Sequence, residues 1–305
     1  MGEFRRNLAL SGTAVASALR LAISLVVLAL VAAPAFSQRY EQGVLWRVEK
    51  AGAPASHVFG TVHVDDPRVN KLPAPVSRAL GEASSLTVEL SLDPGNIMAL
   101  ASRMLLQDGR TLAGIAGADL YGRASTLAGK LGLPEPALNL FKPWAVALLV
   151  MMPQQNPENV LDFMLVRTAA SQGKPVHELE TVDEQVDVFE GMTEADQVAL
   201  LHYAVENHER MPRHTARLVN AYLARDLASL WRISQEDAGR PETRRLNEVF
   251  VERVLFSRNR RMAERMETRL KEGGGLVAIG ALHLYGDRGV LAELQRRGYR
   301  LTRVY

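Results

Sequence analysis

Two segments of the chain share the pattern Gly-x-x-His. Phe59–His63 reads FGTVH and Ile279–His283 reads IGALH, and each closes an apolar segment. If these segments are parallel strands, their carboxyl ends meet at one edge of a sheet, which would bring His63 and His283 together. Imidazole is both a general base near neutral pH and a common metal ligand. The paired motif therefore favours a functional site, whereas a single Gly-x-x-His is equally typical of a histidine that only ends a strand.

Two glutamates occupy comparable positions. Glu89 lies near the end of the apolar segment SLTVEL, where a carboxylate is costly unless it is paired, hydrogen-bonded or metal-bound. Glu180 lies just before Thr181, at a junction between a predicted strand and a predicted helix. A helix N-terminus favours an anion, so Glu180 is either a site residue or a contributor to the helix cap.

Arg258 and Asn259 interrupt the apolar face of a predicted helix. Arg258 lies four residues after Val254, and Asn259 lies four residues after Leu255, so each falls in line with an apolar side chain. A polar residue in such a position indicates a buried polar site. The alternative is a solvated, arginine-rich helix, because three more arginines follow by position 265.

The segments around these residues predict an α/β fold with a mixed, largely parallel sheet. The first two strands predict a hairpin, and the order strand, helix, strand over residues 56–90 predicts a parallel βαβ unit. Residues from about 95 to 270 predict a large helical insertion, interrupted by one short strand. The predicted strands are Val44–Val48, Ser56–Val62, Ser85–Leu90, Lys174–Leu179, Leu276–Gly280 and Tyr299–Val304.

Helix boundaries are also marked in the sequence. Residues 67–83 and 287–297 have helical patterns, and the glycines at 273–275 predict the end of a long helix. Thr181 and Glu184 have the spacing of a capping box, in which each residue's side chain accepts a hydrogen bond from the other's backbone N–H. A helix is therefore expected to begin at Thr181.

The first 37 residues are typical of a secretory signal peptide. Three arginines precede the 13-residue apolar run Leu21–Ala33, and Ala35 and Ser37 supply the small residues expected before a cut at Gln38. An uncleaved membrane anchor is the weaker alternative, because a spanning helix needs about 20 apolar residues. We expect a periplasmic or secreted chain with no stable membrane span after cleavage.

Charge and composition narrow the class of protein. The chain has 36 basic and 34 acidic residues; residues 1–37 hold three Arg and one Glu, which leaves 36 − 3 = 33 basic and 34 − 1 = 33 acidic residues. This balance argues against a nucleic-acid partner. The absence of cysteine excludes disulfides, a thiolate nucleophile and cysteine-ligated zinc. Without repeats or a low-complexity linker, residues 38–305 predict a single α/β domain.

The chain resembles the TraB/PrgY/GumN family, which includes the Tiki metalloproteases, and is most similar to bacterial GumN-like members. The matching segments occur in the family's order and are GTVH, TVELSLD, HELETVDEQ, SRNRRM and GALHLYGDRGV. The resemblance implies a fold related to the erythromycin-esterase and ChaN-like folds. It also implies a divalent-metal-dependent hydrolase with His63, Glu89 and His283 as metal ligands. Glu180, Arg258 and Asn259 lie in matching motifs as candidate catalytic residues.

The chemistry of these side chains is consistent with that implication. Imidazole and carboxylate ligands suit Mn²⁺, Co²⁺ or Zn²⁺, and such a metal makes hydroxide available near neutral pH. Glu180 or Glu89 would accept the proton, Arg258 would stabilise an oxyanion, and Asn259 would orient a ligand or the substrate carbonyl. The expected substrate is a peptide or a small amide or ester. Replacement of these strand-end residues is expected to cost little stability.

Two other functions stay open at the level of sequence. One is a metal-free hydrolase, similar to the erythromycin esterases, in which His63 is the general base. The other is a protein that captures a peptide or haem without turnover.

Overall fold

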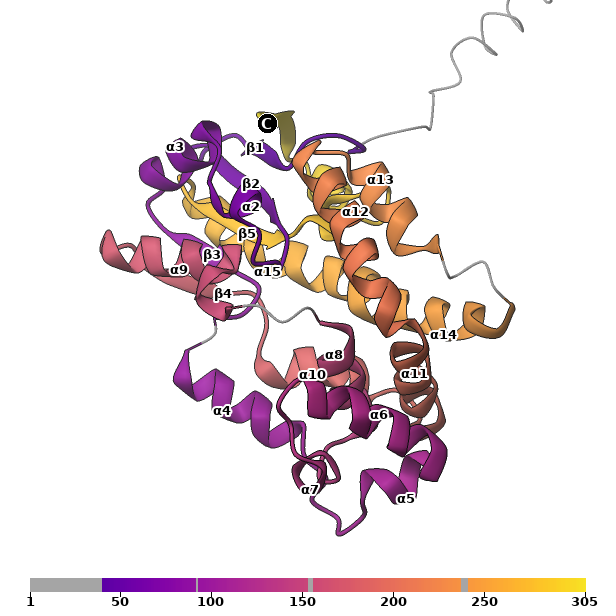
Figure 1. Ribbon diagram of the computed structural model, residues 1–305. Coiled ribbons are helices and arrows are strands. Elements are labelled where there is room, and N and C mark those ends of the chain that lie inside the picture. The colour runs from indigo at the N-terminus through magenta and orange to yellow at the C-terminus, as the bar shows by residue number, and fades with distance from the viewer. Residues whose placement is uncertain (1–39, 92, 153–155, 237–240) are drawn as a thin grey trace, which may run out of the picture. The chain divides into compact units, whose positions relative to one another are not determined.

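The computed structural model describes residues 40–91, 93–152, 156–236 and 241–305. The predicted signal peptide, residues 1–37, lies outside these described residues. The described part of the chain combines a sheet with many helices (Figure 1).

Six strands form one sheet within the described residues, in the order β4-β3-β5-β2-β1-β6. The pairs β4–β3, β3–β5 and β5–β2 are parallel, and β1 is antiparallel to both β2 and β6. The mixed, largely parallel sheet predicted from the sequence is therefore confirmed. The strands are β1 (Leu45–Glu49), β2 (Ser56–Thr61), β3 (Leu86–Val88), β4 (Val176–Glu178), β5 (Leu276–Gly280) and β6 (Arg300–Arg303).

Each strand lies within a segment predicted to be a strand or one residue beyond it, and β1 and β2 form the predicted hairpin. The predicted βαβ unit differs in one respect. Strands β2 and β3 run in the same direction, but β5 lies between them and pairs with both. A strand from the end of the chain thus occupies the centre of the parallel part of the sheet.

Most of the remaining described residues are helical. The α-helices are α2 (Pro67–Asn70), α3 (Ala74–Glu82), α4 (Pro94–Arg103), α5 (Leu112–Ala116), α6 (Ala118–Lys130), α7 (Glu135–Leu138), α8 (Pro143–Met151), α9 (Leu161–Ser171), α10 (Val182–Glu190), α11 (Glu194–Asn207), α12 (Met211–Leu223), α13 (Leu227–Ser234), α14 (Pro241–Val251), α15 (Ser257–Glu272) and α16 (Val290–Arg296). Shorter turns are η1 (Pro157–Asn159), η2 (His208–Arg210), the π-helical turn η4 (Glu252–Phe256) and η5 (Ala281–Leu284).

The helix boundaries follow local chemistry. The helix predicted over residues 67–83 is two helices, α2 and α3, because Pro73 disfavours helical backbone at the residue before it. The capping box is confirmed: Thr181 accepts a hydrogen bond from the Glu184 N–H, and Glu184 accepts one from the Thr181 N–H. Helix α15 ends where Gly273 adopts a positive φ of 75°.

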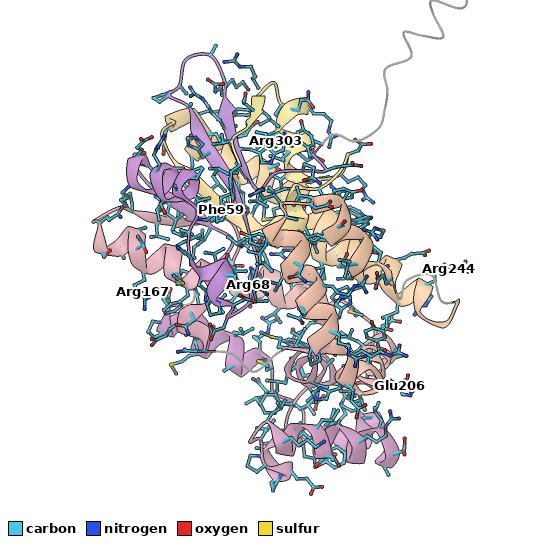
Figure 2. The ribbon with its side chains drawn as sticks, turned by 45° about the horizontal axis from the view of Figure 1, so that its top comes forward. Phe59, Arg68, Arg167, Glu206, Arg244 and Arg303 are labelled. Atoms are coloured by element: carbon cyan, nitrogen blue, oxygen red, sulfur yellow. The ribbon has the colours of Figure 1, made fainter. Side chains whose placement is uncertain are left out.

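The core has separate parts. One cluster of buried apolar side chains surrounds the sheet and includes Phe59, Leu276 and Met262. Another joins α6, α8 and α11 in the helical segment and includes Val146 and Leu201. Figure 2 shows Phe59 within the fold, while Arg167, Glu206 and Arg244 extend outward from helices. In the part of the chain that the structure describes, no helix has both the length and the apolar character needed to cross a membrane.

Gly60 allows two segments to approach each other closely. A Cβ atom at this position would lie 2.7 Å from Leu284 Cδ1 and 3.0 Å from Ala281 Cα, so the turn after β5 packs against the bare backbone of β2. The first Gly-x-x-His motif therefore makes room for the second. Its glycine is required by packing rather than by a positive φ.

Gly60→Ala is expected to lower the free energy of unfolding by about 1–3 kcal/mol, because the added methyl group overpacks this contact. Gly81→Ala is the matched control, since a Cβ at Gly81 in α3 meets nothing within 4 Å. That change should leave stability equal or raise it by up to about 1 kcal/mol, since alanine favours helix. Urea unfolding of both variants measures the difference. Equal stability of the two would contradict the packing role of Gly60.

Candidate active site

Four neighbouring parallel strands end at the same edge of the sheet, and each is followed by one of the predicted site residues. Glu180 follows β4, Glu89 follows β3, His283 lies in the turn after β5, and His63 follows β2. The carboxyl ends of parallel strands are the usual place for a site in an α/β sheet. Arg258 and Asn259 reach this edge from α15.

Glu89 and His283 form the buried centre of this edge. Glu89 Oε1 accepts a hydrogen bond from the Gly280 N–H at 2.7 Å and lies 3.6 Å from His283 Nε2. The two side chains are only 12% and 5% exposed. Glu89 Oε2 accepts a hydrogen bond from Arg258 Nη2 at 2.6 Å. Backbone, imidazole and guanidinium thus converge on one carboxylate.

Asn259 determines which nitrogen of His283 carries the proton. Asn259 Nδ2 donates to the Arg288 carbonyl oxygen at 2.8 Å, so its Oδ1 is the atom that faces His283. This oxygen lies 2.6 Å from His283 Nδ1, and an amide oxygen can only accept. His283 Nδ1 must therefore carry the proton and donate it. In the neutral ring Nε2 is then unprotonated, and its lone pair faces Glu89.

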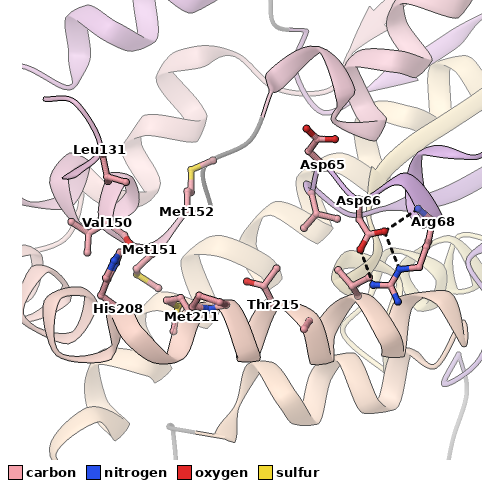
Figure 3. A pocket seen from close by; sticks show the side chains of 14 residues that line it. Asp65, Asp66, Arg68, Leu131, Val150, Met151, Met152, His208, Met211 and Thr215 are labelled. Carbon is pink, nitrogen blue, oxygen red and sulfur yellow. Dashed lines mark hydrogen bonds and ion pairs between the residues drawn. The ribbon is translucent and has the colours of Figure 1, made fainter. Parts of the chain in front are cut away.

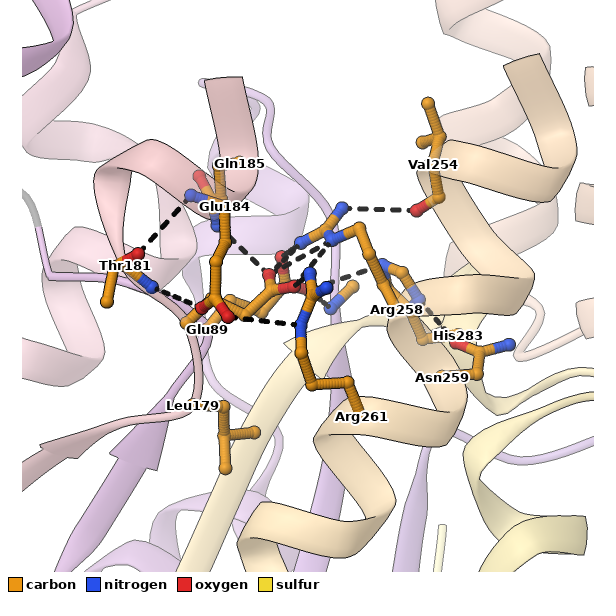
Figure 4. A network of polar contacts seen from close by, with 12 residues as sticks. Glu89, Leu179, Thr181, Glu184, Gln185, Val254, Arg258, Asn259, Arg261 and His283 are labelled. Carbon is orange, nitrogen blue, oxygen red and sulfur yellow. Dashed lines mark hydrogen bonds and ion pairs between the residues drawn. The ribbon is translucent and has the colours of Figure 1, made fainter. Parts of the chain in front are cut away.

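Arg258 connects Glu89 with Glu180, and Figure 4 labels Arg258 and Glu89 in this network of polar contacts. Its Nε lies 3.0 Å from both oxygens of Glu180, and its Nη2 lies 2.5 Å from Glu180 Oε2. Arg261 donates to Glu180 Oε1 at 2.8 Å, and the Glu180 side chain is fully buried. Glu180 is therefore held by two arginines, and Arg261 is a site neighbour that the sequence-based set does not contain.

The buried charges shift each other's pKa. Burial would raise the pKa of Glu89, but His283, which is charged when protonated at low pH, and Arg258 lower it to about 2. Burial lowers the pKa of His283 to about 4, so this ring is neutral near pH 7 and Arg258 is the cation that keeps Glu89 ionised. Burial would lower the pKa of Arg258, yet Glu89 and Glu180 raise it further above its ordinary value.

His63 forms a second pair, with a residue that sequence reasoning missed. His63 Nε2 lies 3.6 Å from Asp162 Oδ2, and the His63 side chain is 59% exposed. Asp162 Oδ1 accepts a hydrogen bond from Thr61 Oγ1 at 2.7 Å, while Oδ2 is buried without a hydrogen bond from any described residue. Asp162 raises the pKa of His63, with a smaller contribution in the same direction from Glu89.

The signal for Asp162 was a carboxylate inside the apolar run VLDFML at the start of α9. That segment belongs to the helical part of the sequence, where a single acidic residue is usually solvated. The contacts of Asp162 with Thr61 and His63 depend on the packing of α9 beside the end of β2, so the sequence alone does not indicate them.

The structure thus arranges the predicted residues as two imidazole–carboxylate pairs. His283 pairs with Glu89, and His63 pairs with Asp162, while Glu180, Arg258 and Asn259 contact the first pair. Among the described residues, no three His, Asp or Glu side chains are grouped closely enough to hold a metal ion. The arrangement offers an exposed imidazole beside a buried one, together with two carboxylates.

Comparison with known proteins places the chain in a family. A family model described as the TraB/PrgY/gumN family matches residues 44–303. The metalloprotease TIKI2 of Danio rerio is 26% identical over 316 residues, which cover 86% of this chain and 61% of the relative. The metalloprotease TIKI1 of Homo sapiens is 25% identical over 309 residues, covering 84% of this chain and 60% of the relative. The chain therefore spans about three fifths of the length of these Tiki relatives.

A bacterial protein matches over more of its own length. The uncharacterized protein YbaP of Escherichia coli (strain K12) is 24% identical over 257 residues, which cover 79% of this chain and 87% of the relative. No solved structure matches the chain.

Proposed function

Because the chain belongs to the TraB/PrgY/gumN family, which holds its Tiki relatives, we propose that it hydrolyses peptide or related amide bonds. These relatives are metalloproteases by name, which supports a hydrolase at the level of the family. This proposal includes the hydrolytic reaction and its peptide or amide substrate. It also includes the predicted relation to the erythromycin-esterase and ChaN-like folds.

One observation carries the proposal. Two imidazole–carboxylate pairs, each with a nitrogen–oxygen separation of 3.6 Å, lie beyond the ends of the adjacent strands β5 and β2. Each pair combines a group that can bind a cation or accept a proton with a second group that orients it.

The donor atoms suit a divalent metal in two respects. His283 presents the lone pair of Nε2 toward Glu89, because Asn259 holds the proton on Nδ1. Two ligand atoms that share one metal at about 2.0–2.2 Å lie roughly 3.4 Å apart, close to the 3.6 Å between His283 Nε2 and Glu89 Oε1. The pairs are not gathered into one group of three, so a metal would have to draw them together.

We assign His63, Glu89 and His283 as the residues that would hold Mn²⁺, Co²⁺ or Zn²⁺. When bound, such an ion lowers the pKa of water and polarises a carbonyl group. Asp162 Oδ2, which lies 3.6 Å from His63 Nε2 and receives no hydrogen bond from the described residues, would accept a proton from water at this site.

The other polar residues would position this set. Asn259 fixes the tautomer of His283, and Arg258 orients Glu89. The sequence predicts Glu180 as a base and Arg258 as an oxyanion donor. Both roles would require the hydrogen bonds between Glu180 and Arg258 to break. Because both Glu180 oxygens accept from arginines in a fully buried position, a positioning role is favoured.

Removal of metal tests the proposal. Protein treated with a chelator and then dialysed is expected to lose peptide hydrolysis and to regain it with one of Mn²⁺, Co²⁺ or Zn²⁺. The measurements are metal content per chain by elemental analysis and the rate on a fluorogenic peptide library. Full activity without bound metal would contradict metal dependence. Tight binding of a peptide or of haem without turnover would instead favour the capture function.

A metal-free hydrolase is the second candidate, and the pair His63–Asp162 favours it. The exposed ring of His63 is accessible to a substrate, and Asp162 raises its pKa above the ordinary value of 6.5. In this candidate His63 Nε2 would accept the proton from water, and Asp162 would orient and stabilise the charged ring.

We also propose that the chain is exported, on the strength of the arginines, the apolar run and the small residues before Gln38. Intact-mass measurement on protein from an extracytoplasmic fraction is expected to give a mass without residues 1–37. A mass that includes Met1, or recovery only from the cytoplasm, would contradict export.

A further inference from the structure

Two apolar cavities lie beside the candidate site, outside the residues assigned above. The first has a volume of about 480 Å³ and is bordered by Val64, which directly follows His63. The second has a volume of about 360 Å³ and is bordered by Leu282, which directly precedes His283. Both volumes fall in the range of roughly 300–1,000 Å³ that is typical of small-ligand pockets.

The two cavities meet on α12. Met151, Met211 and Thr215 line both of them, so the two cavities are adjacent along α12, and together we call them the α12 groove. Figure 3 shows the first cavity, with Met211 and Thr215 along the helix, Asp65 and Asp66 toward one end, and Met151 and Val150 toward the other. Each cavity is thus bordered by a sequence neighbour of one of the two histidines.

The lining of the groove is mainly apolar. Leucine, valine, methionine and phenylalanine side chains from α8, α11, α12, α14 and the π-helical turn η4 form its apolar wall. Polar residues also border the two cavities, and most of them contact other parts of the protein. Asp66 binds Arg68, and His208 Nδ1 lies 2.9 Å from the Val150 carbonyl oxygen. This chemistry fits apolar side chains and offers little to a charged ligand.

The π-helical turn connects the groove to the site. Val254 and Leu255 line the second cavity, and the Val254 carbonyl oxygen accepts a hydrogen bond from Arg258 Nη1 at 3.2 Å. A π-helical turn inside an α-helix is costly and is frequently found at functional sites. Here it precedes Arg258 directly, so that one short segment lines the cavity and also holds the arginine that orients Glu89.

We propose that the α12 groove binds large apolar side chains of a peptide substrate, so that the enzyme prefers leucine, methionine or phenylalanine near the cleaved bond. This inference rests on the proposed function, since it names the substrate class of the same site. Methionine suits such a surface because its flexible, polarisable side chain adapts to different apolar partners.

The test compares binding and turnover in separate assays. End-capped peptides that differ at one position, with Leu, Phe, Ala or Asp, are titrated into the wild-type chain by calorimetry. We expect Leu and Phe peptides to bind about tenfold or more tighter than the Ala peptide, as several buried methylene groups imply. Equal affinity for all four peptides would overturn the proposal.

Thr215→Phe fills the junction of the two cavities without altering an assigned site residue. It is expected to abolish most of the discrimination between Leu and Ala peptides. Thr126→Phe is the matched control, because Thr126 is exposed on α6 and lines neither cavity; its discrimination should equal that of the wild type. Unchanged discrimination in a folded Thr215→Phe variant would overturn the proposal.

Met151→Ala provides a second variant in case Thr215→Phe does not fold. By enlarging the junction it should shift the preference from Leu toward Phe; an unshifted preference counts against the groove. Apolar discrimination in binding without any hydrolysis would keep this inference and reject the proposed function. Hydrolysis without apolar discrimination would do the reverse.

Discussion

His283→Ala is expected to abolish both metal binding and peptide hydrolysis, whereas a metal-free mechanism predicts that hydrolysis survives. Removal of the outer partner of a metal ligand costs about 10–100-fold in affinity or activity, so loss of a ligand itself should cost more. His283 is 5% exposed and its ring is held by Asn259, so it cannot itself reach a substrate in the way that the exposed His63 can. Its contribution in the metal mechanism is therefore made through the cation.

His63→Ala is the necessary comparison, because both mechanisms predict that this variant is inactive. The two variants together distinguish the metal-dependent from the metal-free mechanism. Loss of turnover in both variants favours the metal, and loss in His63→Ala alone favours His63 as the base. Thermal midpoints of both variants should be measured, because a variant that does not fold would also be inactive.

The pH profile gives an independent measurement. In the metal-free candidate the neutral ring of His63 is the active form, so activity falls as the pH drops through its pKa. Asp162 raises that pKa above 6.5, and Asp162→Asn should therefore move the acid limb of the profile to lower pH. A limb that stays in place would indicate that His63 is not the titrating base.

Glu180→Gln is expected to destabilise the fold by about 3–5 kcal/mol, because it leaves the buried Arg258 with only one carboxylate. The side chains of Arg258 and Glu180 are 11% and 0% exposed, so water cannot hydrate the guanidinium group in place of the lost carboxylate. From the sequence alone we expect little loss for a polar residue at a strand end. The structure changes this expectation, because Glu180 is an internal partner of two arginines.

Glu184→Gln is the matched control for this prediction. Glu184 lies four residues later, pairs with Arg265 and is 25% exposed, and glutamine can preserve the capping box. It should cost about 1 kcal/mol or less, as partly exposed ion pairs usually do. Chemical unfolding curves of the two variants give the comparison. A loss for Glu180→Gln as small as that of the control would show that Arg258 does not depend on Glu180.

Local sequence patterns determined the strands, several helix ends and the positions of most site residues. Apolar segments predicted all six strands within the described residues, and the capping box predicted the start of α10 at Thr181. These features depend on residues a few positions apart, so they can be recognised without knowledge of the fold. Placement of His63, Glu89, Glu180 and His283 at strand ends followed from the same patterns, because each lies at or shortly after the end of an apolar segment.

The pairing of these residues was decided by the tertiary structure. The insertion of β5 between β2 and β3 brings His283 next to Glu89, and it depends on hydrogen bonds between strands that are about 200 residues apart in the chain. Asp162 reaches His63 only through the packing of α9, and no pattern around Asp162 encodes that contact. Likewise, whether a glutamate serves as a base or as an ion-pair partner depends on which arginines surround it. For Glu180 these are Arg258 and Arg261, which approach from a helix nearly 80 residues later in the sequence.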